Sequence, residues 1–268
     1  MTDTLKFPIL NYQKIYNTKK VIDYYSKFVG AIRANMTPEQ KNYWHISLHS
    51  GPQGFRTTPI PNDDGNTFEI SLNLISHSAK ISSSTGNVRS IPLKDRSISA
   101  FSNELLSVLE TMNIKPDIEL EKFKDNSELA YDKNIASDIF RSYSLIDILF
   151  KTFKGTITYE TSPVQLWPHH MDIAFTCYPG PENKKIEQIG FGYLTGDETV
   201  QEPYFYVTAY PEIEDISDIV LTKDAYWNPD GWQGVVLKYG DLIKTNNPSE
   251  TLMTHLQNTF DQIIENTK

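Results

Sequence analysis

The sequence predicts an α+β protein with mostly antiparallel sheets and with helices packed on one face. Segments with apolar residues at helical spacing enclose groups of shorter segments in which apolar and polar residues alternate. The alternating segments follow one another through short turns, which favours antiparallel pairing. The order helix, four strands, helix occurs twice in the 268 residues. This order fits an internal duplication, and it also fits a single α+β domain whose halves agree by chance.

The first half, residues 1–116, begins with a helical segment. Between residues 18 and 35, apolar side chains recur at helical spacing and define one buried face. Four strand-like segments come next, the last two joined as a hairpin by the turn-rich SSTGN; they are YWHISLHS, TFEISLNLI, HSAKIS and NVRSIPL. Residues 97–113 return to helical spacing and close this half.

The second half, residues 117–268, repeats the order. A helix is predicted over residues 134–154, and Ser249 is a suitable N-cap for a last helix. Four strand-like segments lie between them: LWPHHMDIAFTCY, QIGFGYL, PYFYVTAY and WQGVVLKY. We also predict a short strand in DIELEKF before the third long helix, with FPILNY as its counterpart before the first. We expect the two halves to form one compact domain.

Composition excludes several classes of protein. At 39% hydrophobic and 22% charged residues, the chain is typical of a globular protein rather than a disordered or fibrous one. The net charge of −9 and the lack of a basic cluster argue against nucleic-acid binding. No segment approaches the roughly 20 apolar residues of a membrane span. A single cysteine and a start without signal-peptide features predict a cytoplasmic protein.

Two of the six histidines stand beside a carboxylate in the stretch WPHHMD. In a regular strand, Trp167 and His169 point toward the helix-covered core, while His170 and Asp172 share the polar face. We therefore interpret His169 as a core histidine. His170 and Asp172 are close enough for the carboxylate to orient and charge the imidazole. We expect His170 to be an acid/base group and Asp172 its orienting partner.

The two following strands add candidates to the same polar face. Alternation leaves Gly190 and Gly192 outward in QIGFGYL, and Tyr204 and Tyr206 outward in PYFYVTAY. A pair of strand glycines often marks close approach of another group, so they are expected to form a floor beside a tyrosine wall. The alternative is cross-strand Tyr–Gly packing that stabilises a weak strand.

The corresponding face of the first half offers His45 as a second candidate acid/base group. His45 and His49 stand about 13 Å apart at the rise of a strand, too far to share one ion unaided. The sequence contains no P-loop and no GxGxxG motif. Cys177 falls on the apolar side of its strand, which argues against a nucleophilic thiol. We expect no metal site and no cofactor.

Landmarks along nearly the whole chain resemble the family of domain of unknown function 5996. In order they are FPILNYQKIYNTKKVIDYYSKFVGAIR, YWHISL, TTPIP, FEISLNLISH, SPVQLWPHHMDIA, GFGYLTGD and EPYFYVTAYPE. The family pattern keeps Trp167 and Asp172, but many members have small residues in place of His169 and His170 and a histidine in place of Gln165. This departure argues against the two histidines as obligatory ligands.

The resemblance implies a different set of site residues and supplies no established activity. The implied candidates, with the conserved tryptophan of WPHHMD, are Trp44, His45, Thr58, Trp167, Asp172, Glu202 and Tyr206. The first functional hypothesis is a protein that binds a small polar ligand on its open sheet face, with catalysis left open. The second is a non-catalytic module that meets another protein or a second copy of itself, forming a homodimer, through the tyrosine-rich face.

Overall fold

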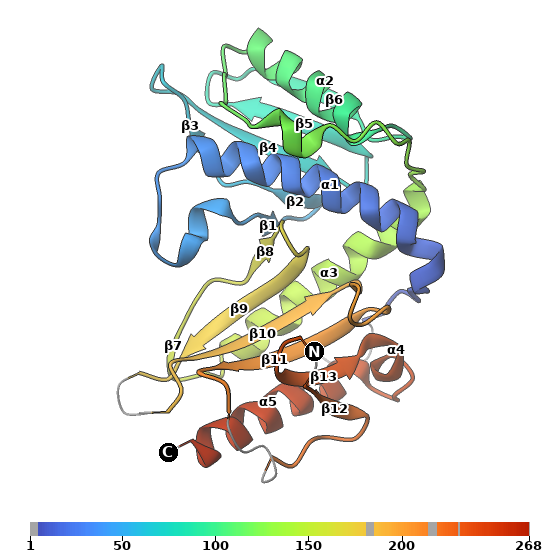
Figure 1. Cartoon of the computed structure of the whole chain (residues 1–268), viewed down its shortest axis with the longest axis vertical. Coiled ribbons are helices and arrows are strands. Elements are labelled where there is room, and N and C mark those ends of the chain that lie inside the picture. Colours follow the sequence, from blue (N-terminus) through green and yellow to red (C-terminus); the bar gives the residue numbers. More distant parts are fainter. Residues whose placement is uncertain (1–4, 181–184, 214–218, 230, 268) are drawn as a thin grey trace. The chain divides into compact units, whose positions relative to one another are not determined.

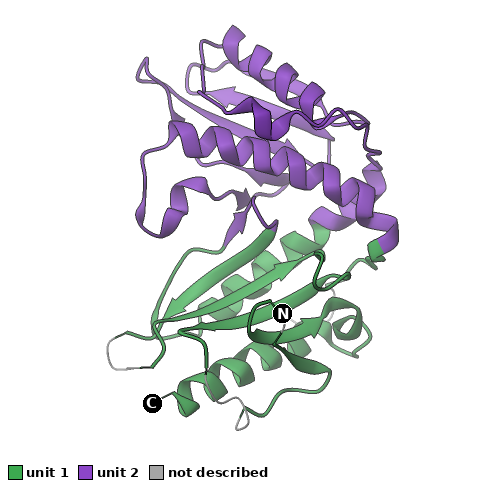
Figure 2. Cartoon of the chain, viewed as in Figure 1, with its two compact units in different colours: residues 1–12, 141–164, 172–268 green, residues 13–140, 165–171 purple. Residues whose placement is uncertain are grey.

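The computed structural model describes residues 5–180, 185–213, 219–229 and 231–267 and contains helices and two antiparallel sheets (Figure 1). The predicted α+β class with antiparallel sheets is confirmed. The chain divides into two compact units (Figure 2): unit 1 comprises residues 1–12, 141–164 and 172–268, and unit 2 comprises residues 13–140 and 165–171. The internal duplication stays a prediction. Within the described residues, none of the helices has the length and apolar character required to span a bilayer.

Unit 2 contains the first sheet, with strand order β1-β2-β4-β5-β6 and β3 also paired with β4. Its helices are α1 (Tyr12–Met36), α2 (Ile98–Thr111) and the start of α3 (Lys133–Lys154). Short 3₁₀ helices are η1 (Lys41–Ile46) and η2 (Leu120–Phe123). The strands are β1 (His49–Ser50), β2 (Gly54–Arg56), β3 (Ile60–Pro61), β4 (Thr67–Asn73), β5 (Ser78–Ser83) and β6 (Val88–Pro92).

Strand alternation in β4 sorts the first sheet into a core face and a polar face. Ile70 is fully buried, whereas Glu69 and Ser71 on either side of it are partly exposed. In the helical layer of unit 2, Tyr25 of α1 stacks on Phe101 of α2 with ring centroids 3.8 Å apart. The hydroxyl of Ser97 accepts the Ala100 N–H at 3.1 Å, the N-cap expected at the start of α2.

Unit 1 contains the second sheet, with strand order β12-β13-β11-β10-β9-β7. The remainder of α3 belongs to unit 1, together with α4 (Tyr239–Leu242) and α5 (Pro248–Asn266). The strands are β7 (Glu160–Thr161), β9 (Asp172–Tyr178), β10 (Gln188–Leu194), β11 (Tyr204–Tyr210), β12 (Ala225–Asn228) and β13 (Gly234–Lys238).

Aromatic residues fill the core between the second sheet and its helices. Phe191 of β10 stacks on Phe175 of β9 with centroids 4.9 Å apart. Phe153 of α3 meets Phe191 at 5.3 Å, and Phe260 of α5 meets it at 6.3 Å. Both strand phenylalanines were predicted to point inward by alternation, and their burial confirms it.

Several element predictions are wrong. The first four residues of YWHISLHS belong to the 3₁₀ helix η1, in which Asn42 and Tyr43 have positive φ, and only His49 and Ser50 are in a strand. DIELEKF contains η2 instead of a strand, and no strand is found in the described residues of FPILNY. The last helix is capped by Asn247, one residue before Pro248 at its first turn, and not by Ser249.

Candidate functional site

On the second sheet, Asp172, Gly192 and Tyr206 lie together on the polar face, as alternation predicted. Gly192 is paired with Ala174 of β9 and with Tyr206 of β11. The Tyr206 hydroxyl donates a hydrogen bond to Oδ2 of Asp172 at 2.5 Å. A Cβ atom on Gly192 would overlap the Tyr206 ring, so this ring occupies the space directly over the glycine. Gly190 belongs to the same face and is opposite Thr208.

Burial and charge keep the proton on the Tyr206 hydroxyl. Asp172 is 7% exposed. Burial, followed by the negative charge of Asp172, raises the pKa of Tyr206 well above its usual value. The phenol therefore keeps its proton at neutral pH and acts as a hydrogen-bond donor to the carboxylate. Gly192 is covered by the Tyr206 ring of the neighbouring strand. This is the cross-strand Tyr–Gly packing that was the alternative interpretation of the two glycines.

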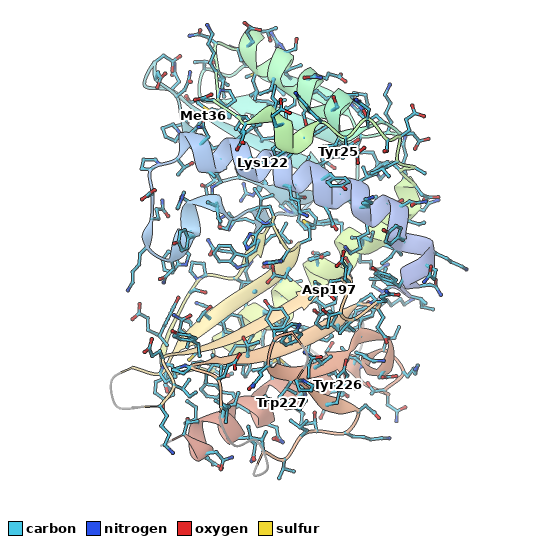
Figure 3. All side chains as sticks on the ribbon, in the orientation of Figure 1. Tyr25, Met36, Lys122, Asp197, Tyr226 and Trp227 are labelled. Carbon is cyan, nitrogen blue, oxygen red and sulfur yellow. The ribbon has the colours of Figure 1, made fainter. Side chains whose placement is uncertain are left out.

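Tyr204 belongs to a second, aromatic part of the same face. Its hydroxyl donates to Oδ2 of Asp197 at 2.7 Å, and Trp232 stacks on its ring with centroids 6.3 Å apart. Tyr204 is 2% exposed, and burial and the Asp197 carboxylate raise its pKa. Asp197 and Tyr226, both labelled in Figure 3, belong to unit 1. Tyr204 thus belongs to a buried cluster with Leu194, Val200 and Val236, against which Tyr206, Tyr226 and Trp232 pack.

Glu202 forms an ion pair with Lys238 of β13 at 2.6 Å. This hydrogen bond raises the pKa of Lys238. The two side chains are more than one-third exposed, so the pair is accessible to solvent. Sequence reasoning missed Lys238, although its register opposite Tyr204 in β11 places it on the polar face.

In unit 2, His45 is held by the backbone. It is 8% exposed, and its Nδ1 accepts the N–H of Gln40 at 3.2 Å. This bond places the imidazole proton on Nε2 in the neutral ring. The neighbouring Trp44 is half-buried, and its carbonyl accepts the hydroxyl of Ser47 at 2.9 Å. Thr58 is also half-buried.

The WPHHMD stretch does not form a continuous strand, which corrects the sequence prediction. β8 (Gln165–Trp167) ends before a turn, in which the N–H of Met171 bonds to the Trp167 carbonyl at 2.8 Å. Met171 has a φ of 54°. A proline has no N–H for a strand ladder, and Pro168 starts the turn. Since β9 starts only at Asp172, no single regular strand gives His170 and Asp172 a shared face.

Both histidines of the turn are exposed, so the interpretation of His169 as a core residue is wrong. Their rings lie side by side with centroids 4.4 Å apart, and Trp167, half-buried, meets His169 edge-on at 6.0 Å. Burial of part of the ring, followed by the charges of His170 and Lys27, lowers the pKa of His169. The turn therefore presents two neighbouring imidazole rings to solvent.

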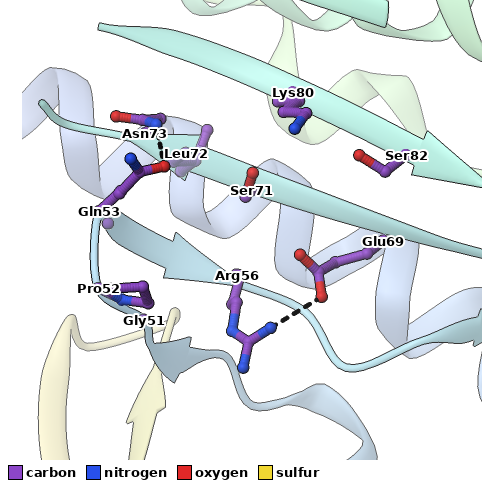
Figure 4. Close-up of a pocket in the computed structure, with 11 residues that line it drawn as sticks. Gly51, Pro52, Gln53, Arg56, Glu69, Ser71, Leu72, Asn73, Lys80 and Ser82 are labelled. Carbon is purple, nitrogen blue, oxygen red and sulfur yellow. Dashed lines mark hydrogen bonds and ion pairs between the residues drawn. The ribbon is translucent and has the colours of Figure 1, made fainter. Parts of the chain in front are cut away.

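The polar face of the first sheet contains a cavity that sequence reasoning did not identify (Figure 4). Arg56 of β2 pairs with Glu69 of β4 at 3.1 Å, and Lys80 lies on β5. Register places Lys80 opposite Ser71 and Glu69 opposite Ser82, so these side chains point to the same side of the sheet. No ion pair of Lys80 is found among the described residues.

A tight turn closes one end of this cavity. The N–H of Gly51 bonds to the carbonyl of Gly54 at 2.8 Å. Gly54 has a φ of 154°, and a Cβ there would overlap the Leu72 carbonyl oxygen, so only glycine fits. The side-chain amide of Asn73 donates to Gln53 at 2.9 Å and fixes the turn against β4. The cavity has a volume of about 170 Å³.

Among the described residues, no three His, Cys, Asp or Glu side chains gather closely enough to hold a metal ion. The predicted candidates instead divide between the units. Asp172, Gly190, Gly192, Glu202, Tyr204 and Tyr206 belong to unit 1, whereas Trp44, His45, Thr58, Trp167 and His170 belong to unit 2.

Comparison with known proteins gives one match. No curated protein and no solved structure matches the chain. A family model described as a family of unknown function, DUF5996, matches residues 7–268, which is almost the full length. The family membership predicted from the sequence landmarks is therefore confirmed, and the chain belongs to the DUF5996 family.

Proposed function

We propose that the protein binds a small anionic molecule on the polar face of the first sheet. The charge balance of the cavity around Lys80 carries the proposal. Glu69 neutralises Arg56, which leaves the Lys80 ammonium group as the excess positive charge on the lining. The chain as a whole has a net charge of −9, so this excess charge is opposite in sign to the net charge of the protein.

The cavity limits the size and chemistry of the ligand. Its volume of about 170 Å³ equals that of roughly five or six water molecules. Ser71 and Ser82 supply hydroxyls on either side of Lys80, and both can donate to an anionic oxygen. Inorganic phosphate and small carboxylates, including amino acids, fit this description, whereas nucleotides exceed it. We propose that the anion is bound in the cytoplasm, and we propose no reaction.

Lys80→Met tests the proposal directly. We expect the variant to bind inorganic phosphate or L-glutamate about fivefold more weakly than the parent, which corresponds to the ~1 kcal/mol of a good exposed ion pair. Titration calorimetry at low salt measures the two dissociation constants. Lys115→Met, an exposed lysine of the same unit outside the cavity, serves as the matched control. Equal affinities of parent and Lys80→Met, or binding of neither anion, would refute the proposal.

The polar face of the second sheet stays a second candidate for small polar ligands. The half-buried Tyr206 is held by Asp172, so a ligand there would contact the outer side of its ring. A thermal-shift screen of sugars, nucleotides and amino acids, with Asp172→Ala beside the parent, tests this site. We expect a ligand of this face to stabilise the parent by several degrees and the variant by much less. A ligand that stabilises both equally binds elsewhere.

A further inference from the structure

A groove in unit 2 has a lining that the proposed function does not use. It lies along α1, and the turn after β8 forms its other wall. The lining is almost entirely apolar, with a volume of about 270 Å³, and consists of Lys27, Gly30, Ala31, Ala34, Ile46, Pro168 and His169. The small side chains of α1 leave this space open, and the wall residues Ile46 and Pro168 present carbon atoms to it.

The groove is built by close packing of the turn against the helix. A Cβ atom on Gly30 would lie 2.7 Å from Cγ of Pro168, so only a glycine lets the turn approach α1 this closely. The packing in turn brings His169, which follows Pro168 directly, into the lining of the groove. Lys27 and His169 both line the groove, so the ammonium group and the imidazole face the same space.

Charge around the groove is positive. Lys27 contributes an ammonium group, which lies 6.0 Å from the centre of the Tyr24 ring. Asp23, one turn earlier on α1, is paired with Lys19 at 2.6 Å and also attracts Lys27, so one carboxylate is shared by two lysines and an excess positive charge remains. Next to Ala34 in sequence, Arg33 is 3% exposed and forms no ion pair with any described residue. Burial without a carboxylate lowers the pKa of Arg33 to about 10.

The hydrogen bonds of Arg33 leave its charge without compensation. Its Nη1 donates to the Ser47 hydroxyl at 3.2 Å, and Nε2 of Gln165 donates to the same oxygen at 2.7 Å. These partners are neutral, and the Arg33 Nε finds no acceptor among the described residues. Since charges act over longer distances in the protein interior than in water, this guanidinium adds to the positive potential of the region.

We propose that the groove binds a small amphipathic carboxylate, with its apolar body against Ala31, Ala34 and Ile46 and its carboxylate beside Lys27 and His169. An apolar lining with a cationic rim complements a molecule that is apolar at one end and anionic at the other. A volume of about 270 Å³, roughly that of nine water molecules, suits a short alkyl chain or one aromatic ring. A peptide helix or a lipid bilayer would require a larger surface.

Octanoate and its neutral counterpart octanol are the probes. We expect octanoate to bind the parent at least fivefold more tightly than octanol, and Lys27→Met to weaken octanoate about fivefold while leaving octanol unchanged. Ala34→Leu, which fills the groove, is expected to weaken both at least tenfold. Ala100→Leu, an exposed alanine on α2, is the matched control for the added volume. Ligand-observed NMR measures the affinities, and circular dichroism verifies that each variant is folded.

The inference is overturned if octanoate does not bind, if octanol binds as tightly as octanoate, or if Ala34→Leu binds octanoate like the parent. Lys80→Met should bind octanoate with parent affinity. Lys80→Met therefore distinguishes the two sites. It should weaken phosphate binding in the cavity of the first sheet and leave octanoate binding in the groove unchanged.

Discussion

Gly192→Ala is expected to lower the free energy of unfolding by about 2–3 kcal/mol and to separate Tyr206 from Asp172. A methyl group on this residue would occupy the place of the Tyr206 ring, which must move. Movement of the ring removes its 2.5 Å hydrogen bond to a buried carboxylate, a bond of the charged class that contributes about 1.5–3 kcal/mol. The lower entropy of an alanine in the unfolded chain offsets up to ~1 kcal/mol of this loss. Urea denaturation measures the net change.

A double-mutant cycle shows whether the ring causes the effect. In a Tyr206→Ala background the space over Gly192 is empty, so Gly192→Ala should be neutral or stabilising there. Gly190→Ala is the matched control, because its Cβ would meet only the Thr208 hydroxyl at 2.8 Å, and that side chain can rotate. An equal cost of Gly192→Ala with and without Tyr206 would show that the tyrosine does not cover the glycine.

His255 is expected to make the protein less stable as the pH falls from about 6.5 to about 4. The imidazole is 1% exposed on α5, where Nδ1 lies 2.7 Å from the Thr222 hydroxyl and Nε2 has no hydrogen-bond partner among the described residues. Burial lowers its pKa from 6.5 to about 4. In this interval the unfolded chain binds the proton and the folded chain does not, so stability is complete above pH 6.5 and is lost toward pH 4.

The size of this effect follows from the same pKa values. At about 1.4 kcal/mol for each pH unit, the lowered pKa of His255 corresponds to a decrease of about 3 kcal/mol in the free energy of unfolding between pH 6.5 and pH 4. His255→Gln keeps a polar partner for Thr222 without titrating, so its stability should fall less than that of the parent between pH 6.5 and 4. Denaturant midpoints at four pH values give both curves, and His170→Gln, an exposed histidine, is the control. Parallel curves for parent and His255→Gln would contradict this assignment.

The sequence predicted the elements whose side chains alternate without interruption. QIGFGYL and the tyrosine-rich strand match β10 and β11, and their inward Phe191 and Phe205 are fully buried. Alternation also predicted that Asp172, Gly192 and Tyr206 share a face. It failed at Pro168, because a turn breaks the period without changing the residue types around it. The alternation of apolar and polar residues predicts which side chains are buried, but it does not predict where the backbone turns.

The cavity of the first sheet could be predicted only in part. The outward placement of Glu69 and Ser71 followed from alternation in TFEISLNLI. The proximity of Lys80 did not, because it depends on the β4–β5 register, which the turn between the strands sets. Arg56 lies in β2, a strand of three residues that is too short to show a period. The buried Arg33 and its partners Ser47 and Gln165 were also missed. A single arginine on the buried face of a helix does not alter the apolar periodicity from which that face is predicted.

Three of the four strands at the margins of the two sheets are short. β1 and β7 have two residues each, β12 has four, and β6 has five and ends at a proline. Each margin therefore offers few backbone donors and acceptors to a strand from another molecule, which limits fibril-like growth and strand exchange. We therefore expect a homodimer of this chain to form mainly through side chains on the sheet or helix faces, where single substitutions can weaken it.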